Sequence, residues 1–273
     1  MKVLPMNRRT LLAALPAVVS LGLLAACSGG AKPDGATLTV AATAVPHAEI
    51  LEQVKPLLAR QGLTLDIRVF NDYVQPNLQV DQRQIDVNYF QTKPYLDQFN
   101  AARGTHLVPF AGIHVEPLGG YSRRYKTLAQ LPDGAVVALP NEPSNGGRAL
   151  LLLQRAGLIR LKAPTNALST LRDIAANPKR LQFKELEAAT LPRVLGEVDL
   201  AMINTNYALD AKLNPTRDAL VIEDAKSPYV NFVVGRAGEQ NDPRVVKLIA
   251  ALRSPQTKAF IDSHYKGAVL PAF

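Results

Sequence analysis

Apolar residues follow two different periods along this chain, and the first clear run after the N-terminal leader lies at residues 38–42. This run predicts a short strand, and the apolar stripe after it recurs at helical spacing until Gly62. From residue 63 to residue 70 apolar and polar side chains alternate, which predicts a second strand with one buried face. The β-α-β order indicates a parallel sheet.

Loops and short elements alternate after residue 70. Loops are predicted at 71–77 and at 90–94; the first leads into a polar helix and the second into a helix that stops at Gly104. A brief strand is predicted at 85–88, and 107–121 holds strand material that proline and glycine interrupt.

A second series of strands and helices begins at residue 135. The pattern predicts strands at 135–139, 181–186, 200–203, 220–222 and 229–234, helices at 170–176 and 191–196, and two final helices from about Pro243 and Pro255. Because strand-helix alternation occurs twice, with a broken passage near 117–121 between the two series, we predict an α/β fold of two lobes.

The expected division is lobe 1 at 37–117, lobe 2 at 118–224, and a return of the chain to lobe 1 at 225–273. The two passages between the lobes, near 117–121 and near 222–229, are predicted to act as hinges. Ligands of open α/β sheets bind beyond the carboxyl ends of the strands, and the loops there hold most of the unusual residues of this chain.

Arg148 is the most unusual of these residues. Residues 140–147 hold two prolines and two glycines, so we predict an irregular segment and then a helix with Ser144 or Asn145 as its N-cap. Arg148 would then lie in the first helical turn, where the helix dipole favours negative charge. A bound carboxylate would explain this cation, and the two glycines would let a ligand approach the backbone. An exposed arginine on a loop explains it equally well.

Two asparagines are further candidates for a binding site. Asn204 directly follows an apolar strand, where a turn or cap role is the simpler interpretation. Asn231 lies inside the predicted strand at 229–234, although asparagine is depleted in strands. A buried amide needs partners, and a ligand could be one; an edge position that faces water is the alternative.

Three aromatic residues, Tyr73, Phe90 and Tyr95, lie in or beside predicted loops, which favours a place in a pocket wall. The signals for catalysis are poor. The four histidines, at positions 47, 106, 114 and 264, have no metal-ligand spacing, and the sequence has no nucleophile-elbow or phosphate-loop motif. We therefore expect no enzyme activity, no catalytic residue, no metal and no cofactor.

The N-terminal leader indicates where the protein resides. Three basic residues precede an apolar run at 11–26, which is short for a membrane span and typical of a signal peptide. The run ends in Leu-Ala-Ala-Cys27, which resembles the bacterial lipobox, where cleavage precedes a cysteine that receives lipid. We expect a signal peptide at 1–26, lipid on Cys27 and a tether at 27–36.

Composition adds few constraints. The apolar fraction of 47% and the charged fraction of 20% are those of an ordinary globular protein. The formal charge is +8, and without the leader cations Lys2, Arg8 and Arg9 it is +5, with no dense basic run. We see no signature of nucleic-acid binding and expect a monomer. One cysteine cannot form an intrachain disulfide.

Five ordered motifs and the lipobox make this chain similar to the NlpA lipoproteins, the methionine-binding lipoproteins of bacterial methionine ABC importers. The resemblance extends from the lipobox to the C-terminus. The motifs in this chain are FNDYVQPN at 70–77, NYFQTKPYL at 88–96, NGGR at 145–148, INTNYA at 203–208 and SPYVN at 227–231.

The resemblance implies a type II periplasmic-binding-protein fold, whose two lobes close on one ligand. It also implies a set of contacts to that ligand: Arg148 at its carboxylate, Asn204 and Asn231 at its backbone polar groups, Tyr73, Phe90, Thr92 and Tyr95 around its side chain, and Asn145 in the same motif as Arg148. The family usually has His where this chain has Thr92, so the side-chain pocket is where this chain departs from the family.

We therefore expect a lipid-anchored solute-binding protein that captures L- or D-methionine in the cell envelope and delivers it to the membrane subunits of an ABC importer. The anchor would hold the protein on a membrane, facing the periplasm or the exterior. Another amino acid or a small methionine-containing peptide is the alternative ligand. An adhesion or scaffold lipoprotein without a tight small ligand is the alternative from a different class.

Overall fold

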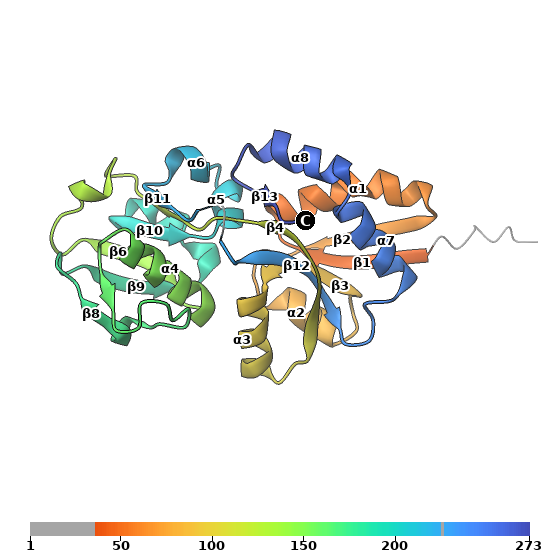
Figure 1. The fold of residues 1–273 in the computed structure, drawn as a ribbon, viewed down its shortest axis with the longest axis horizontal. Coiled ribbons are helices and arrows are strands. Elements are labelled where there is room, and N and C mark those ends of the chain that lie inside the picture. Colours follow the sequence, from red (N-terminus) through yellow and green to blue (C-terminus); the bar gives the residue numbers. More distant parts are fainter. Residues whose placement is uncertain (1–35, 225–226) are drawn as a thin grey trace, which may run out of the picture. The chain divides into compact units, whose positions relative to one another are not determined.

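The computed structural model describes residues 36–224 and 227–273, which form two lobes built on separate sheets (Figure 1). The predicted signal peptide and Cys27 lie outside the described residues, as does all of the predicted tether except Ala36, where the first strand begins. In the described part of the chain, no helix has the length and apolar character that crossing a membrane requires.

Lobe 1 contains a six-stranded mixed sheet in the order β13-β4-β12-β3-β1-β2. Its strands are β1 (Ala36–Ala42), β2 (Leu63–Val69), β3 (Val87–Thr92), β4 (Leu107–Val115), β12 (Val230–Arg236) and β13 (Leu270–Pro271). Its helices are α1 (Glu49–Arg60), α2 (Gln75–Asp81), α3 (Lys93–Arg103), α7 (Pro243–Leu252) and α8 (Pro255–Tyr265). The strand β1 pairs in parallel with β2 and β3, which confirms the predicted β-α-β start.

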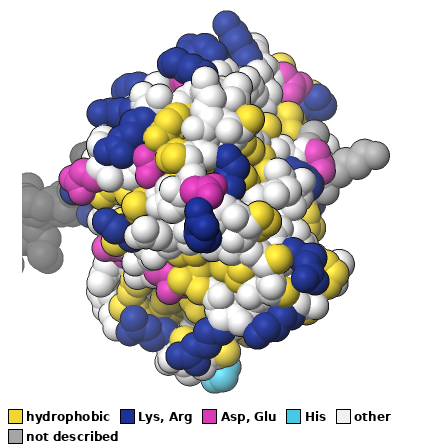
Figure 2. Space-filling model, turned by 90° about the vertical axis from the view of Figure 1, so that its left-hand side faces the viewer, with side chains coloured by type: hydrophobic (Ala, Val, Ile, Leu, Met, Phe, Trp, Pro, Cys, Tyr) yellow, Lys and Arg dark blue, Asp and Glu magenta, His cyan; other side chains and the backbone are white. Residues whose placement is uncertain are grey.

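Lobe 2 contains a five-stranded sheet in the order β11-β5-β10-β6-β9. Its strands are β5 (Gly119–Tyr121), β6 (Val136–Pro140), β9 (Gln182–Leu186), β10 (Leu200–Ile203) and β11 (Val221–Ile222), and a separate pair is formed by β7 (Arg160–Leu161) and β8 (Ile174–Ala176). Its helices are α4 (Pro143–Arg155), α5 (Thr205–Asp210) and α6 (Pro215–Asp218). Figure 2 shows cationic side chains scattered over the outer face of this lobe, with acidic ones between them.

The chain passes between the lobes twice. The first passage joins β4 to β5 and the second joins β11 to β12, which returns the chain to lobe 1 between β3 and β4. The two passages are hydrogen-bonded to each other: the backbone N–H of Glu223 donates to the carbonyl of Leu118 at 3.0 Å. The helices α7 and α8 then pack on α1, in the core of lobe 1.

Several predictions of local structure are wrong, and local contacts explain them. Residues 90–92 continue strand β3 instead of forming a loop, because β3 is buried along its whole length between β1 and β12. The helix α2 already begins at Gln75, inside the predicted loop 71–77. Residues 170–176 are not a helix: a capping box closes one short turn at 171–173, and β8 follows.

The start of α4 also differs from the prediction. The N-cap is Glu142, and the helix runs from Pro143 through both glycines, so Arg148 lies in the second turn. The glycines serve internal packing: a Cβ on Gly146 would lie 2.9 Å from the carbonyl oxygen of Pro140, and one on Gly147 would lie 2.1 Å from that of Ala167. The argument from the helix dipole therefore does not apply to Arg148. Gly157 ends the helix with φ +75°, as predicted.

Candidate ligand-binding site

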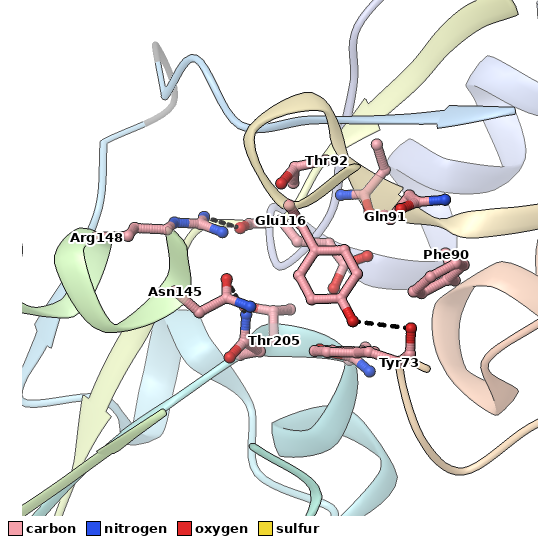
Figure 3. A pocket seen from close by; sticks show the side chains of 12 residues that line it. Tyr73, Phe90, Gln91, Thr92, Glu116, Asn145, Arg148 and Thr205 are labelled. Atoms are coloured by element: carbon pink, nitrogen blue, oxygen red, sulfur yellow. Dashed lines mark hydrogen bonds between the residues drawn. The ribbon is translucent and has the colours of Figure 1, made fainter. Parts of the chain in front are cut away.

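A pocket lies where the two lobes face each other, next to both passages (Figure 3). Its empty space is about 350 Å³, including the part that is open to solvent. The structure brings all eight predicted contact residues to its wall, together with four that the sequence reasoning did not select. The twelve lining residues are Tyr73, Phe90, Gln91, Thr92, Tyr95, Glu116, Asn145, Arg148, Asn204, Thr205, Asn206 and Asn231.

Arg148 is buried at one end of the pocket, with 3% of its surface exposed, so it is not a loop arginine facing solvent. Its Nε and Nη2 donate to the Glu223 carboxylate at 2.8 and 2.5 Å, and Nη2 also donates to the backbone carbonyl of Glu116 at 2.7 Å. Its guanidinium carbon stands 4.1 Å from the centre of the Tyr229 ring. Burial lowers the pKa of Arg148, but the pair with Glu223 outweighs burial and keeps the pKa above its usual value.

Two asparagines near Arg148 contact each other. Asn204 is the N-cap residue of α5, yet its side chain does not cap that helix; its Nδ2 donates to Asn145 Oδ1 at 3.1 Å. The other side-chain atom, Asn204 Oδ1, is buried and has no hydrogen-bond partner among the described residues. A buried acceptor without a donor is costly, so this oxygen is suited to a ligand N–H.

Aromatic rings form the opposite wall of the pocket. The Tyr73 ring lies 5.7 Å from Phe90, 5.5 Å from Tyr95 and 5.0 Å from Tyr207, centre to centre. Both tyrosine hydroxyl groups donate hydrogen bonds to the protein: Tyr73 to Asn206 Oδ1 at 2.6 Å and Tyr95 to the carbonyl of Tyr73 at 2.8 Å. Only Tyr73 lies in a loop, since Phe90 is on β3 and Tyr95 is on α3.

The β3 residues beside Phe90 complete this wall. Thr92 is 8% exposed and lines the pocket, so its side chain does not face bulk solvent. Gln91 is fixed by a buried amide network in which its Nε2 donates to Asn77 Oδ1 at 2.6 Å and to Asn88 Oδ1 at 2.8 Å. Hydrogen bonds therefore hold Gln91 in place next to Thr92, and Thr92 itself adds a small, branched side chain to the pocket wall.

Glu116 is the acidic side chain of the pocket, and two histidines hold it. Its Oε1 lies 2.8 Å from His114 Nε2 and 3.2 Å from His47 Nε2. The other ring nitrogens are paired as well: His47 Nδ1 with the Thr43 hydroxyl at 2.7 Å, and His114 Nδ1 with the Tyr89 hydroxyl. Two of the four histidines, which are far apart in the sequence, thus converge on Glu116 in lobe 1.

One set of proton positions satisfies every contact of these rings. Each histidine is neutral and carries its proton on Nε2, which donates to Glu116, while Nδ1 accepts from a hydroxyl. Burial lowers the pKa of His47 to about 4 and that of His114 to about 3, in agreement with neutral rings. Burial raises the pKa of Glu116, and His47, Arg148 and the backbone N–H of Asn206 act against that rise.

Donor types alone would let His47, His114 and Glu116 hold a metal ion, since their ligand atoms lie within 4.8 Å of one another. Both Nε2 atoms, however, already donate protons to the carboxylate, and His47 Nε2 also contacts Asn231 Oδ1 at 3.1 Å. Coordination would remove these hydrogen bonds, so the contacts favour a hydrogen-bonded carboxylate.

Asn231 lies on β12, which pairs with β3 on one side and β4 on the other, so the alternative of an edge position is wrong. It is buried, and its bond to His47 joins it to the Glu116 cluster. Glu116 itself was missed by the sequence reasoning. The available signal is an acid inside the apolar run Ile-His-Val-Glu-Pro-Leu at 113–118, where a charge needs a partner.

Comparison with known sequences relates the chain to lipoproteins. The family model for the NlpA lipoprotein matches residues 38–273. The methionine-binding lipoprotein MetQ of Bacillus subtilis is 41% identical over 261 residues, which cover 93% of this chain and 95% of that protein. The D-methionine-binding lipoprotein MetQ of Escherichia coli is 43% identical over 213 residues, 77% of this chain and 79% of that protein.

A solved structure agrees with both the fold and the family. A nutrient-binding protein from Burkholderia cenocepacia bound to methionine superposes with a TM-score of 0.84 at 45% identity. The match covers 86% of this chain and all of that one.

Proposed function

The chain belongs to the NlpA lipoprotein family, and from this premise we propose that it binds methionine and delivers it to an ABC importer. The observation that carries the proposal is the pairing, in one small pocket, of a buried cation and a buried acid opposite a wall of aromatic rings. A zwitterionic amino acid with an apolar side chain matches such a pocket in charge and in shape.

The carboxylate of the ligand is assigned to Arg148 at the α4 end. Because Glu223 already occupies Nε and Nη2, the ligand would meet the Nη1 edge of the guanidinium rather than its open fork. The ammonium is assigned to Glu116 and to the unpartnered Asn204 Oδ1, with Asn231 beside them. A cation near Glu116 favours its ionised form and compensates its burial.

The thioether side chain is assigned to Tyr73, Phe90, Tyr95 and Thr92. Sulfur contacts to aromatic rings contribute roughly 0.3–1.5 kcal/mol each, so several rings around one side chain favour methionine over an aliphatic ligand of equal size. The nearness of the two charged groups favours a single amino acid: Arg148 donates to the backbone of Glu116 itself. A dipeptide separates its ammonium and carboxylate by an additional residue.

Mass spectrometry of ligand retained on gently purified protein, followed by calorimetry, tests this proposal. We expect methionine in the retained fraction, and much weaker binding of N-acetylmethionine and methioninamide, which each lose one charge. A retained peptide, or equal affinity for all three compounds, would replace methionine by the alternative ligand. Absence of any small ligand at high protein concentration would favour an adhesion or scaffold role.

Membrane attachment through Cys27 is a separate part of the proposal, supported by membership of a lipoprotein family. An acyl chain contributes about 0.8 kcal/mol per buried CH₂, and one chain alone binds only marginally, so several chains on Cys27 would make attachment stable. Cys27→Ser should release the protein from membranes or leave it unprocessed. A processed Ser variant that still sediments with membranes would refute the anchor.

A further inference from the structure

Hydrogen bonds connect the two lobes at places other than the ligand contacts. The Tyr207 hydroxyl of lobe 2 reaches the carbonyl of Asn71 in lobe 1 at 3.4 Å. More centrally, Gln98 Oε1 on α3 accepts the backbone N–H of Ser144 on α4 at 2.9 Å. The helices α3 and α4 are also in direct contact across the gap between the lobes.

The hydrogen bond to Gln98 satisfies a backbone N–H at the start of α4. Ser144 is the second residue of the helix, so its N–H has no acceptor within the helix. In the described structure, the side chain of the N-cap residue Glu142 makes no capping hydrogen bond. A glutamine from the other lobe therefore caps α4, the helix that carries Asn145 and Arg148.

We propose that Gln98 is a positioning residue that holds the closed lobes together, by capping α4 from α3. Gln98 stands outside the twelve residues that line the pocket, whereas Tyr95, one turn earlier on the same helix, is among them. The bond requires the lobes to be closed, because its donor and acceptor belong to different lobes. It therefore acts after the ligand has entered, and it slows release without touching the ligand.

This inference rests on the proposed function in one respect only: methionine is taken as the ligand around which the two lobes close. Gln98→Met keeps the length of the side chain and removes the acceptor. One neutral hydrogen bond corresponds to a change of roughly three- to ten-fold, so stopped-flow tyrosine fluorescence should show faster methionine release by that factor and an unchanged association rate. Gln53→Met, at an exposed position of α1 away from the contact between α3 and α4, is the matched control. It should leave both rates unchanged.

Thermal unfolding of ligand-free protein separates this role from a purely structural one. The Gln98 variant should unfold at the wild-type temperature without ligand and at a lower temperature with saturating methionine. An unchanged release rate, or an equal loss of stability with and without ligand, overturns the proposal.

Wild-type protein that fails to bind methionine would instead refute the proposed function. The role of Gln98 is then read from small-angle scattering of the two proteins as purified. A larger radius of gyration for Gln98→Met supports the proposal that Gln98 holds the lobes together, and equal radii overturn it.

Discussion

The two ends of the pocket are built on different physical principles. At the α4 end, charged and amide groups are fixed before any ligand arrives: Glu223 orients Arg148, and two histidines orient Glu116. At the opposite end, Tyr73, Phe90 and Tyr95 form a wall by ring packing, and the two tyrosine hydroxyl groups donate hydrogen bonds to protein acceptors. In the proposed mode of binding, the first end contacts the ammonium and carboxylate that all amino acids share, and the second contacts the side chain that distinguishes them.

This difference determines how mutations should behave. Removing one partner of a buried ion pair leaves an uncompensated charge, which costs roughly 3–5 kcal/mol, whereas losing one contact to an aromatic ring costs about 1 kcal/mol. Substitutions at the polar end should therefore weaken all ligands together. Substitutions in the aromatic wall should instead change the ranking of the ligands.

The largest effect is expected for Arg148→Ala. Loss of the buried cation should weaken methionine binding on the order of a hundred-fold or more in calorimetry, because each 1.4 kcal/mol is about ten-fold. Arg148→Lys should recover binding only in part, since an ammonium cannot keep the two-pronged pair with Glu223. Affinity of the Ala variant near that of the wild type would refute the assignment.

Arg148→Ala also leaves the Glu223 carboxylate unpaired, which provides a control. The double variant Arg148→Ala/Glu223→Ala removes both charges, so it should be more stable than the single variant in urea unfolding but bind no better. If the double variant recovers methionine binding, the loss in the single variant reflects stability and not ligand contact.

Glu116→Gln should have the next largest effect. The amide keeps the shape but removes the charge assigned to the ligand ammonium, and hydrogen bonds to charged groups contribute about 1.5–3 kcal/mol. We expect binding to weaken roughly ten- to hundred-fold, again for methionine and for its aliphatic analogue norleucine alike. A loss confined to methionine would show that Glu116 reads the side chain and would break the division between the two ends.

The stability of the protein should fall as the pH decreases below about 6.5, the usual histidine value, toward the lowered values of about 4 for His47 and about 3 for His114. In this window the unfolded chain binds protons that the folded rings do not, while above it the contribution is fully present. Glu116, with its pKa raised by burial, opposes the trend in part.

His114→Gln tests this expectation by urea unfolding between pH 4 and pH 6.5. The amide N–H can replace the Nε2 donor to Glu116. Because the variant lacks one titrating ring, the slope of its free energy of unfolding against pH should be smaller by up to about 1.4 kcal/mol per pH unit. An unchanged slope would mean that the His114 ring does not remain neutral in the folded protein.

Thr92→His should have the smallest effect and bears on the aromatic end alone. An additional ring in the wall should change the affinity ratio of methionine to a methionine dipeptide by only a few-fold, since one sulfur–ring contact contributes at most about 1.5 kcal/mol. Titration of both proteins with both ligands measures that ratio. An identical ratio in the two proteins would mean that the wall tolerates Thr92 without functional consequence.

The sequence by itself determined the local elements and the content of the motifs. Alternating and helical spacing located β2, α1 and α7, because these elements bury one face in a core and leave the other in solvent. A short apolar run located β1, which is buried on both faces. The strand β10 follows its predicted bounds, and its short apolar run is buried throughout. Segments with weak periodicity, such as 170–176, were assigned incorrectly, since capping and strand pairing decided their structure.

Only the tertiary structure decided which charges meet. Glu223 and Arg148 are 75 residues apart. His47 comes from the helical segment Ala44–Ala48 before α1, His114 from the end of β4 and Glu116 from the first passage, and only the folded lobe brings them together. The reason is physical: a local pattern records burial and backbone preference, while the partner of a buried charge is fixed by long-range packing. The sequence could therefore name Arg148 and the aromatic residues, but neither Glu223, which orients Arg148, nor Glu116, which completes the site.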